Sequence, residues 1–239
     1  ENVPLVLYSQ SKEARDSIIG VANSKNSKVI LNDLEKIELL ENTKNGQIIN
    51  YKDFKNLKIN LLGSHQINNA TISLELLEQL RKMGFEISNE SIYNGFSSVT
   101  WPCRFELVSK NPDFILDGAH NIDGIEKFIS SMNFYYKDNK KIGIFGVLAD
   151  KDYNEMLAKI VPCFDVFLTV RPDSERAMES KELKERIEKL TKKKVYSFEN
   201  YQDAIDKAFE ISKEDDVISA FGSLYFVGEV RNLLGVGDY

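Results

Sequence analysis

The chain has 239 residues, of which 42% are hydrophobic and 28% are charged, and its formal net charge is -6. The hydrophobic content is high enough to fill a core. The acidic charge balance leaves no basic surface for binding a nucleic acid, and the two cysteines are too far apart in the sequence to indicate a disulfide framework. No apolar run reaches the roughly 20 residues that span a bilayer, so we expect no membrane segment. The cysteine spacing favours a reducing cytoplasm, and the charge favours small-molecule or protein partners. We also expect a monomer.

The first part of the chain is expected to be α/β with an antiparallel extension. β-prone runs at residues 3–8 and 28–31 flank a helical stretch at residues 12–22. Further along, Asn45-Gly46 separates two more β-prone runs, which is a hairpin signal. We therefore predict a strand, a helix and a strand, followed by a hairpin.

Two helices are expected next. Apolar residues recur every three or four positions and predict a helix over residues 68–83, with Gly84 as its stop. A second helix is expected over residues 89–96. The polar run that leads to Pro102 interrupts this pattern, so we place a domain boundary near Ser98.

The rest of the chain alternates between β-prone and helical stretches. The β-prone runs cover residues 105–108, 114–116, 142–145, 166–170, 195–198 and 217–221. The helical stretches cover residues 122–135, 153–161, 181–191, 201–211 and 224–234. This alternation is typical of βαβ units, so we predict a Rossmann-like, mostly parallel sheet domain.

The richest candidate site follows the run at residues 114–116. In an open parallel sheet, ligands meet the loops that leave the carboxyl ends of the strands. Here that loop contains Asp117, which could accept hydrogen bonds from a ribose or orient a cation, and His120, which could donate to a phosphate or transfer a proton. The alternative is that Asp117 or Asn121 caps the next helix and that His120 is an ordinary surface residue.

Three other strand ends give weaker signals. Gly146 allows close backbone approach before a charged stretch, which ordinary turn chemistry also explains. Arg171 and Arg176 could face an anionic ligand or be solvated. Ser223 stands at a strand-to-helix turn, where it could contact a ligand or cap the helix.

Two candidate sites lie upstream of these loops. The segment at residues 63–70 contains His65 and Asn69, whose polar groups could meet an anion or a base edge at a helix start, although helix capping by Asn68 is the alternative. Arg104 could reach a bound ligand or form a salt bridge on a strand edge. The sequence has no GxxxxGK[ST] loop, no GxGxxG after a strand and no close histidine pair, so no metal ligand is assigned.

Five ordered segments resemble the folylpolyglutamate synthase/dihydrofolate synthase family of Mur-type ligases. They are G-x-H-Q-x-x-N-A at residues 63–70, W-P-C-R at 101–104, D-G-A-H-N at 117–121, G-x-x-x-D-K-D at 146–152 and G-S-L-Y at 222–225. The resemblance implies that residues 1–98 are the carboxy-terminal portion of a central Mur-ligase-type ATPase domain. Residues 99–239 would then be the carboxy-terminal Rossmann-like domain. It also implies that a phosphate loop and the Mg²⁺ ligands belong to an amino-terminal half outside this chain.

The resemblance also assigns residue roles. Carried over position by position, it makes Asn69, Arg104 and Asp117 contacts of ATP. His120 falls at or near the reacting end and is the catalytic candidate together with Asp117, whereas His65 and Ser223 are weaker candidates. One departure is that Cys103 stands where most members have glycine, which puts the backbone conformation of that loop in question.

The implied reaction is an ATP- and Mg²⁺-dependent addition of L-glutamate to the γ-carboxylate of a folate derivative through an acyl phosphate, in one-carbon metabolism. The sequence leaves open whether the protein also has dihydrofolate synthase activity. We expect the chain alone to lack ligase activity, because it has no phosphate loop. The alternatives are a Mur-type muropeptide ligase and a non-catalytic Rossmann-like binding module.

Overall fold

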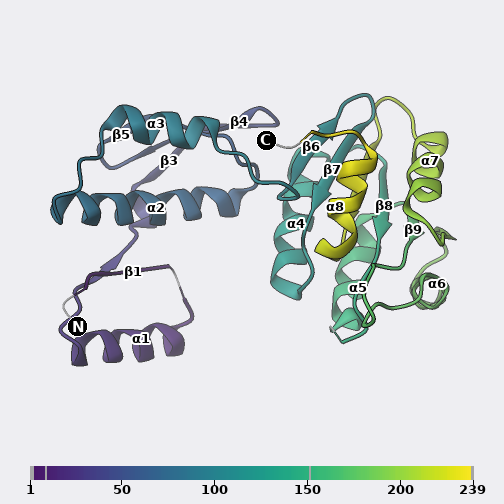
Figure 1. Ribbon diagram of the computed structural model, residues 1–239, viewed down its shortest axis with the longest axis horizontal. Coiled ribbons are helices and arrows are strands. Elements are labelled where there is room, and N and C mark those ends of the chain that lie inside the picture. The colour runs from purple at the N-terminus through teal and green to yellow at the C-terminus, as the bar shows by residue number, and fades with distance from the viewer. Residues whose placement is uncertain (1–2, 9, 151, 238–239) are drawn as a thin grey trace. The chain divides into compact units, whose positions relative to one another are not determined.

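The computed structural model describes residues 3–8, 10–150 and 152–237, and the chain divides into two compact units, residues 1–100 and 101–239 (Figure 1). The division falls two residues after the boundary expected at Ser98. Each unit has its own buried hydrophobic core. Among the helices of the described residues, none is both long and apolar enough to cross a bilayer.

The first unit begins with a small parallel sheet and continues with an antiparallel one. Strands β1 (Leu5–Leu7) and β2 (Val29–Leu31) pair in parallel, with helix α1 (Lys12–Ser24) between them along the chain. After the short 3-10 helix η1 (Leu34–Lys36), strands β3 (Ile37–Thr43), β4 (Gly46–Tyr51) and β5 (Phe54–Ile59) form an antiparallel sheet in that order. The hairpin predicted at Asn45-Gly46 is therefore confirmed as the β3–β4 turn.

Two helices follow this sheet, α2 (Ser64–Lys82) and α3 (Asn89–Ser98). Helix α2 begins four residues before the expected start, because Gly63, with φ at +100°, turns the chain into it. Asn68 therefore lies inside the helix, and the interpretation of Asn68 as its cap is wrong. The apolar face of α2, which includes Ala70 and Leu74, packs against the β3–β4–β5 sheet to form the core of this unit.

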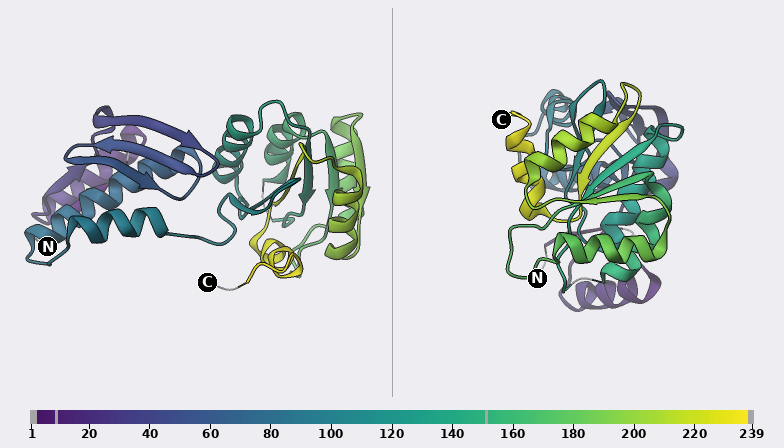
Figure 2. Two further views of the ribbon diagram at one scale, coloured as in Figure 1. Left: turned by 90° about the horizontal axis from the view of Figure 1, so that it is seen from above. Right: turned by 90° about the vertical axis from the view of Figure 1, so that its right-hand side faces the viewer.

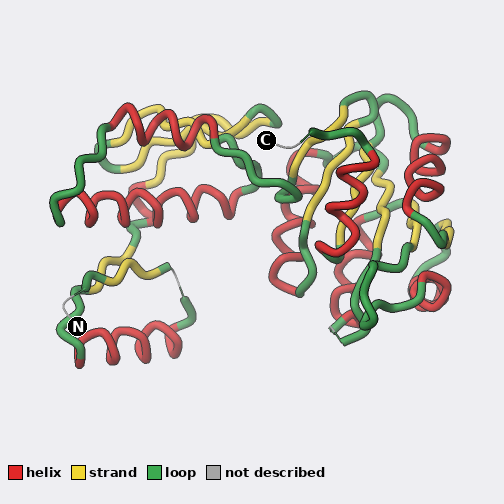
Figure 3. Tube along the Cα trace, viewed as in Figure 1, coloured by secondary structure: helices red, strands yellow, loops and turns green. Residues whose placement is uncertain are grey.

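The second unit is built on a six-stranded sheet in the order β10-β9-β8-β11-β7-β6. Figure 3 draws the strands in yellow and the helices around them in red. Its strands are β6 (Glu106–Ser109), β7 (Asp113–Asp117), β8 (Lys141–Phe145), β9 (Val166–Thr169), β10 (Lys194–Ser197) and β11 (Val217–Phe221). All neighbours pair in parallel except β6 and β7, which are joined by a short turn and pair antiparallel. The predicted mostly parallel sheet is confirmed.

Helices cover both faces of this sheet (Figure 2). They are α4 (Ile122–Tyr135), α5 (Tyr153–Cys163), α6 (Ser180–Leu190), α7 (Tyr201–Ile211) and α8 (Leu224–Leu233). Helices α7 and α8 pack on one face, against alternate residues of the central strands. On the other face, Phe128 of α4 and Phe164 after α5 place their rings 4.5 and 4.9 Å from that of Phe221. This two-faced packing fixes the strand ends that carry the candidate site.

Candidate functional site

The carboxyl ends of three neighbouring strands form one edge in the second unit. Phe221 at the end of β11 pairs with Asp117 of β7 on one side and with Phe145 of β8 on the other, so the three strands stop level with one another. The loops that follow are in direct contact, because a Cβ atom on Gly222 would lie only 2.3 Å from the carbonyl oxygen of Gly146. The edge is therefore a rigid platform for the polar residues that follow it.

Asp117 joins two loops at this edge. Its Oδ1 accepts a hydrogen bond of 2.7 Å from the backbone N–H of Ala119, in its own loop. Its Oδ2 accepts one of 2.9 Å from the backbone N–H of Phe105, directly after Arg104. The suggestion that Asp117 caps the next helix is wrong, since Asn121 caps α4 by accepting from the Gly124 N–H at 2.8 Å. Asp117 thus holds residues 101–105, here called the Arg104 loop, against the end of β7.

The Arg104 loop is held from further directions as well. The backbone N–H of Cys103 donates to Oε2 of Glu106 at 2.8 Å, and its carbonyl accepts from the Gly118 N–H at 2.7 Å. Cys103 has φ at +57°, the left-handed region that favours glycine. Cys103 therefore adopts a backbone conformation that glycine adopts readily, and the exposed Arg104 side chain is presented at the strand ends.

The carboxyl group of Asp117 has an unusual pKa. Burial raises the pKa of Asp117 from its ordinary value of 3.8 to about 6, although the Ala119 and Phe105 N–H groups and the charges of Arg104 and His120 act in the opposite direction. The folded state therefore binds this proton more tightly than the unfolded state does. Its stabilising effect is fully present below the unfolded pKa and is lost as the pH rises through the folded pKa.

This raised pKa predicts a pH dependence of stability. Between about pH 4 and about pH 7, the free energy of unfolding of the wild type minus that of Asp117→Asn should fall by about 2 kcal/mol. Denaturant titrations at a series of pH values measure this difference, and the carboxyl ¹³C shift of Asp117 should titrate near pH 6. A difference that stays constant, with a carboxyl midpoint near 4, would contradict the expected burial effect.

His120 and Ser223 flank the same edge. His120 is exposed, and its Nδ1 lies 2.8 Å from the carbonyl oxygen of Gly118, which can only accept, so Nδ1 carries the hydrogen. The Nε2 atom of the neutral ring is then an acceptor. Ser223 is 2% exposed and caps α8, with its Oγ accepting from the Tyr225 N–H at 3.3 Å. The structure thus supports the capping interpretation of Ser223.

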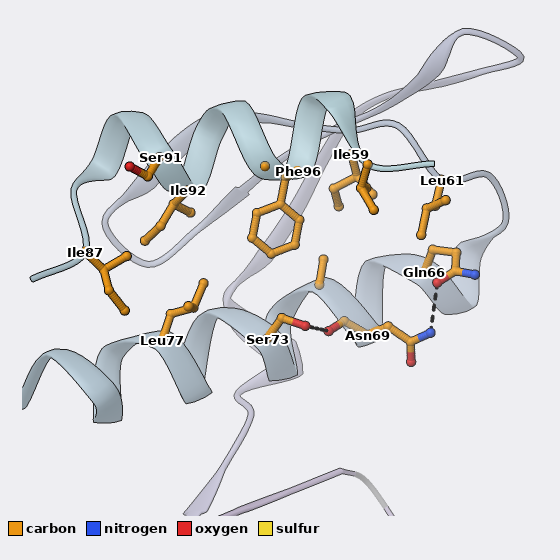
Figure 4. A pocket seen from close by; sticks show the side chains of 13 residues that line it. Ile59, Leu61, Gln66, Asn69, Ser73, Leu77, Ile87, Ser91, Ile92 and Phe96 are labelled. Carbon is orange, nitrogen blue, oxygen red and sulfur yellow. Dashed lines mark hydrogen bonds between the residues drawn. The ribbon is translucent and has the colours of Figure 1, made fainter. Parts of the chain in front are cut away.

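The first unit holds the other two predicted residues, Asn69 and His65. A pocket of about 310 Å³ lies between α2, α3 and β5 and is also lined by the segments beside them. Figure 4 shows the side chains that line it. Its wall is largely apolar, with Gln66, Asn69 and Ser73 along one side. Asn69 Nδ2 donates to Oε1 of Gln66 at 2.9 Å, which orients its amide. His65 does not line the pocket, but its Nε2 lies 3.1 Å from Nε2 of Gln66, which does.

The structure therefore brings some of the predicted residues together. Arg104, Asp117 and His120 share one edge of the second unit, whereas Asn69 and His65 belong to the first unit. Within the described part of the chain, no group of three or more His, Cys, Asp or Glu residues is placed to hold a metal ion. No Mg²⁺ ligand is therefore assigned among these residues.

Sequence reasoning missed one pair of residues that supports this edge. Arg231 of α8 lies 3.2 Å from both carboxyl oxygens of Glu106, which in turn accepts from the Cys103 N–H. The guanidinium also donates to the carbonyl oxygens of Val236 and Gly237. Glu106 and Arg231 are 125 positions apart, so no local pattern in the sequence signals their contact.

Comparison with known proteins gives consistent results. Residues 103–224, slightly more than half of the chain, match the family model described as Mur ligase, glutamate ligase domain. The dihydrofolate synthase/folylpolyglutamate synthase of Bacillus subtilis is 31% identical over 185 residues, which cover 77% of this chain and 42% of that protein. The chain thus spans less than half of the length of this curated relative.

Solved structures agree with the sequence matches. The folylpolyglutamate synthase of Thermotoga maritima is 29% identical, with a TM-score of 0.83, and the match covers 100% of this chain and 55% of that one. Escherichia coli FolC, solved in complex with DHPP and ADP, is 25% identical, with a TM-score of 0.76 and coverage of 92% and 50%. The chain therefore belongs to the Mur ligase family, in its glutamate ligase domain, and to the folylpolyglutamate synthase branch of that family.

Proposed function

We propose that this chain is part of an ATP-dependent ligase that adds L-glutamate to the γ-carboxylate of a folate derivative through an acyl phosphate. The support comes from the family and from two relatives, one named as a dihydrofolate synthase/folylpolyglutamate synthase and one solved with DHPP and ADP. The chain spans about half of these proteins, so the activity belongs to the whole protein. Dihydrofolate synthase activity is proposed as an addition, because the Bacillus subtilis relative is named for both activities.

The observation that carries this proposal is the presentation of Arg104. Its loop is tied to Asp117, Glu106 and Gly118 by three backbone hydrogen bonds, while its side chain stays exposed at the carboxyl edge of the sheet. Negative charge accumulates on the oxygens of a transferring phosphoryl group, and a guanidinium held in advance stabilises it without reorganisation. Arg104 is therefore proposed to contact the phosphates of ATP.

The pocket of the first unit is suited to a planar base. Its volume is at the small end of the range for ligand sites, and its apolar wall suits the faces of a planar base. Asn69 lines it, and an amide offers both a donor and an acceptor to the edge of such a base. We propose that Asn69 contacts the adenine of ATP.

His120 and Asp117 are proposed to have different roles. Attack on an acyl phosphate needs a neutral amine, so the ammonium group of the incoming glutamate must lose a proton. The Nε2 atom of His120 is an acceptor on an exposed ring and can take that proton. Asp117 acts as a positioning residue, because both of its carboxyl oxygens already bind backbone N–H groups.

We also propose that the isolated chain has no ligase activity and binds ATP weakly. Mg²⁺ supplies charge neutralisation at phosphates, but the described residues form no cluster that would hold it. The sequence likewise has no phosphate loop. Glutamate addition to a reduced folate by the purified 239-residue chain would contradict this proposal.

Titration with ATP, followed by ¹H–¹⁵N NMR of the chain, tests the nucleotide site. We expect shifts at Arg104 and at Asn69, and we expect Arg104→Ala to weaken binding at least about tenfold, because a charged hydrogen bond to phosphate is lost. Lys189→Ala is the matched control, since it removes one positive charge from the last turn of α6. Equal ATP affinity in both variants would refute the role of Arg104. Binding of a nicotinamide dinucleotide in place of ATP would favour a non-catalytic binding module.

A further inference from the structure

The first turn of α2 is held in place by a buried amide of the neighbouring sheet. Gln47 of β4 is 0% exposed, and its Nε2 donates to the carbonyl oxygens of Leu61 at 2.8 Å and of Gly63 at 3.1 Å. The carbonyl oxygen of Gly63 also accepts from the N–H of Gln66 at 2.9 Å. The backbone that carries His65 and Gln66 is therefore fixed before a ligand binds.

Hydrogen bonds between three side chains of α2 fix the orientation of the Asn69 amide. Asn69 Nδ2 donates to Oε1 of Gln66 at 2.9 Å (Figure 4). Because Oε1 of the buried Gln66 is engaged in this way, the other group of its amide, the Nε2 donor, faces His65, whose ring Nε2 lies 3.1 Å away. A side-chain NH₂ group can only donate, so the ring nitrogen of His65 accepts.

His65 therefore stands at one end of a directed relay that consists of His65, Gln66 and Asn69. Since Nε2 of His65 accepts, the neutral ring carries its hydrogen on Nδ1. If the Gln66 amide turned by 180°, its oxygen would face an acceptor on His65 and its nitrogen would face a donor on Asn69. Both hydrogen bonds would be lost at a buried amide, so a single member of the relay cannot reverse by itself.

The other end of the relay is the exposed amide of Asn69, which lines the pocket of the first unit. Within the described residues, the hydrogen bonds of this amide engage its Nδ2, so its Oδ1 is left for a ligand. Adenine has a donor at its 6-amino group and an acceptor at N7, and an asparagine amide matches both. A purine with a carbonyl at position 6 would place a second acceptor against Oδ1.

We propose that His65, acting through Gln66, fixes the Asn69 amide in the orientation that selects adenine over a 6-oxo purine. The inference rests on the proposed function, in which Asn69 contacts the base of ATP. His65 does not line the pocket, so it is a positioning residue that determines base specificity without touching the base. Its part in the relay is to offer an acceptor, and any side chain that offers only an acceptor at that place should serve.

The test compares ATP with ITP, which has a carbonyl at position 6 of its base. Each is titrated into the ¹⁵N-labelled 239-residue chain, with the side-chain amide of Asn69 as the probe. We expect the wild type to bind ATP at least about tenfold more tightly than ITP. His65→Phe should bring the two affinities within about threefold, mainly by strengthening ITP binding, because both amide orientations become available. His65→Glu, whose carboxylate can only accept, should keep the preference for ATP.

A second pair of variants separates amide orientation from general damage to α2. Gln66→Leu interrupts the relay and should also bring the two affinities within about threefold. Gln79→Leu makes the same change at another buried position of α2 that does not line the pocket, and it should leave both affinities within about twofold. A role of His65 in stability alone would weaken ATP and ITP binding equally.

The relay can also be examined without a nucleotide. In the free chain, ¹⁵N NMR of the His65 imidazole should show a hydrogen on Nδ1 and none on Nε2. A hydrogen on Nε2, equal affinities in the wild type, or an undiminished preference in His65→Phe would each overturn the inference.

Failure of the inference is distinguishable from failure of the proposed function. If ATP shifts the signals of Asn69 and Arg104 and ITP binds equally well, the inference fails while the ligase proposal stands. If ATP shifts neither residue, the nucleotide site of the ligase proposal fails, and the inference fails with it.

Discussion

Replacing Gly222 with alanine is expected to lower the free energy of unfolding of residues 101–239 by more than about 4 kcal/mol. Gly222 has φ at +113°, which side chains rarely adopt. The new Cβ would also lie 2.3 Å from the carbonyl oxygen of Gly146 and 2.6 Å from Cε2 of Phe145. Both neighbours are buried beside the central strands, so neither can move without disturbing the sheet.

Gly228→Ala is the matched control for this substitution. Gly228 lies inside α8, and a Cβ there would meet no heavy atom within 4 Å. We expect it to raise stability by up to about 1 kcal/mol, because alanine is the better helix former. Amide hydrogen exchange at β8 and β11 measures the second unit separately from the first. Equal protection of these amides in the two variants would show that the close approach at Gly222 can relax.

Replacing Arg231 with methionine is expected to lower the free energy of unfolding by about 3–5 kcal/mol, because the buried carboxylate of Glu106 loses its guanidinium partner. The side chains of Arg231 and Glu106 are only 6% and 10% exposed. Without Arg231, the carboxylate of Glu106 stays buried beside the Cys103 N–H. Hydrogen exchange and denaturant titration of the chain measure the loss.

The effect of this substitution should reach the Arg104 loop. Burial, followed by the charge of Glu106, raises the pKa of the Cys103 thiol to about 11, so Cys103 should react slowly with thiol reagents in the wild type. Loss of the Arg231 charge raises the pKa of Cys103 further, so any increase in its reactivity in Arg231→Met reports opening of the Arg104 loop, and we expect that increase. In the double variant Glu106→Gln with Arg231→Met, part of the stability should return, because the buried charge that lost its guanidinium is gone. If the changes in the free energy of unfolding caused by Glu106→Gln and Arg231→Met simply add, the two residues do not act as a coupled pair.

Most of the fold of the second unit could be predicted from the sequence. Helices α4 and α7 begin and end at the expected residues, because their polar N-caps and apolar stripes are clear. The start of α2 was wrong because Gly63 gives no side-chain cap and the first turn is polar. The antiparallel direction of β6 relative to β7 could not be predicted, because the alternation of apolar and polar residues is the same in parallel and antiparallel strands.

The candidate site was predictable as a list of residues and less so as an arrangement. The five segments pointed to Arg104 and Asp117, and the structure places them in adjoining loops. That both oxygens of Asp117 bind backbone N–H groups could not be inferred, because backbone donors carry no sequence signal. The support from Glu106 and Arg231 depends on a contact across 125 positions, which only the folded sheet creates.

The antiparallel pairing of β6 with β7 determines where this domain can change in length. The register aligns Glu106 with Leu116, so the start of β6 and the end of β7 meet at the same edge. The turn between these strands, at residues 110–112, lies at the opposite edge. Residues inserted in that turn would extend the hairpin away from the site without altering the spacing between Arg104 and Asp117. Relatives of this chain can therefore differ in the length of this turn, whereas a single residue inserted between Arg104 and Glu106 would move the guanidinium.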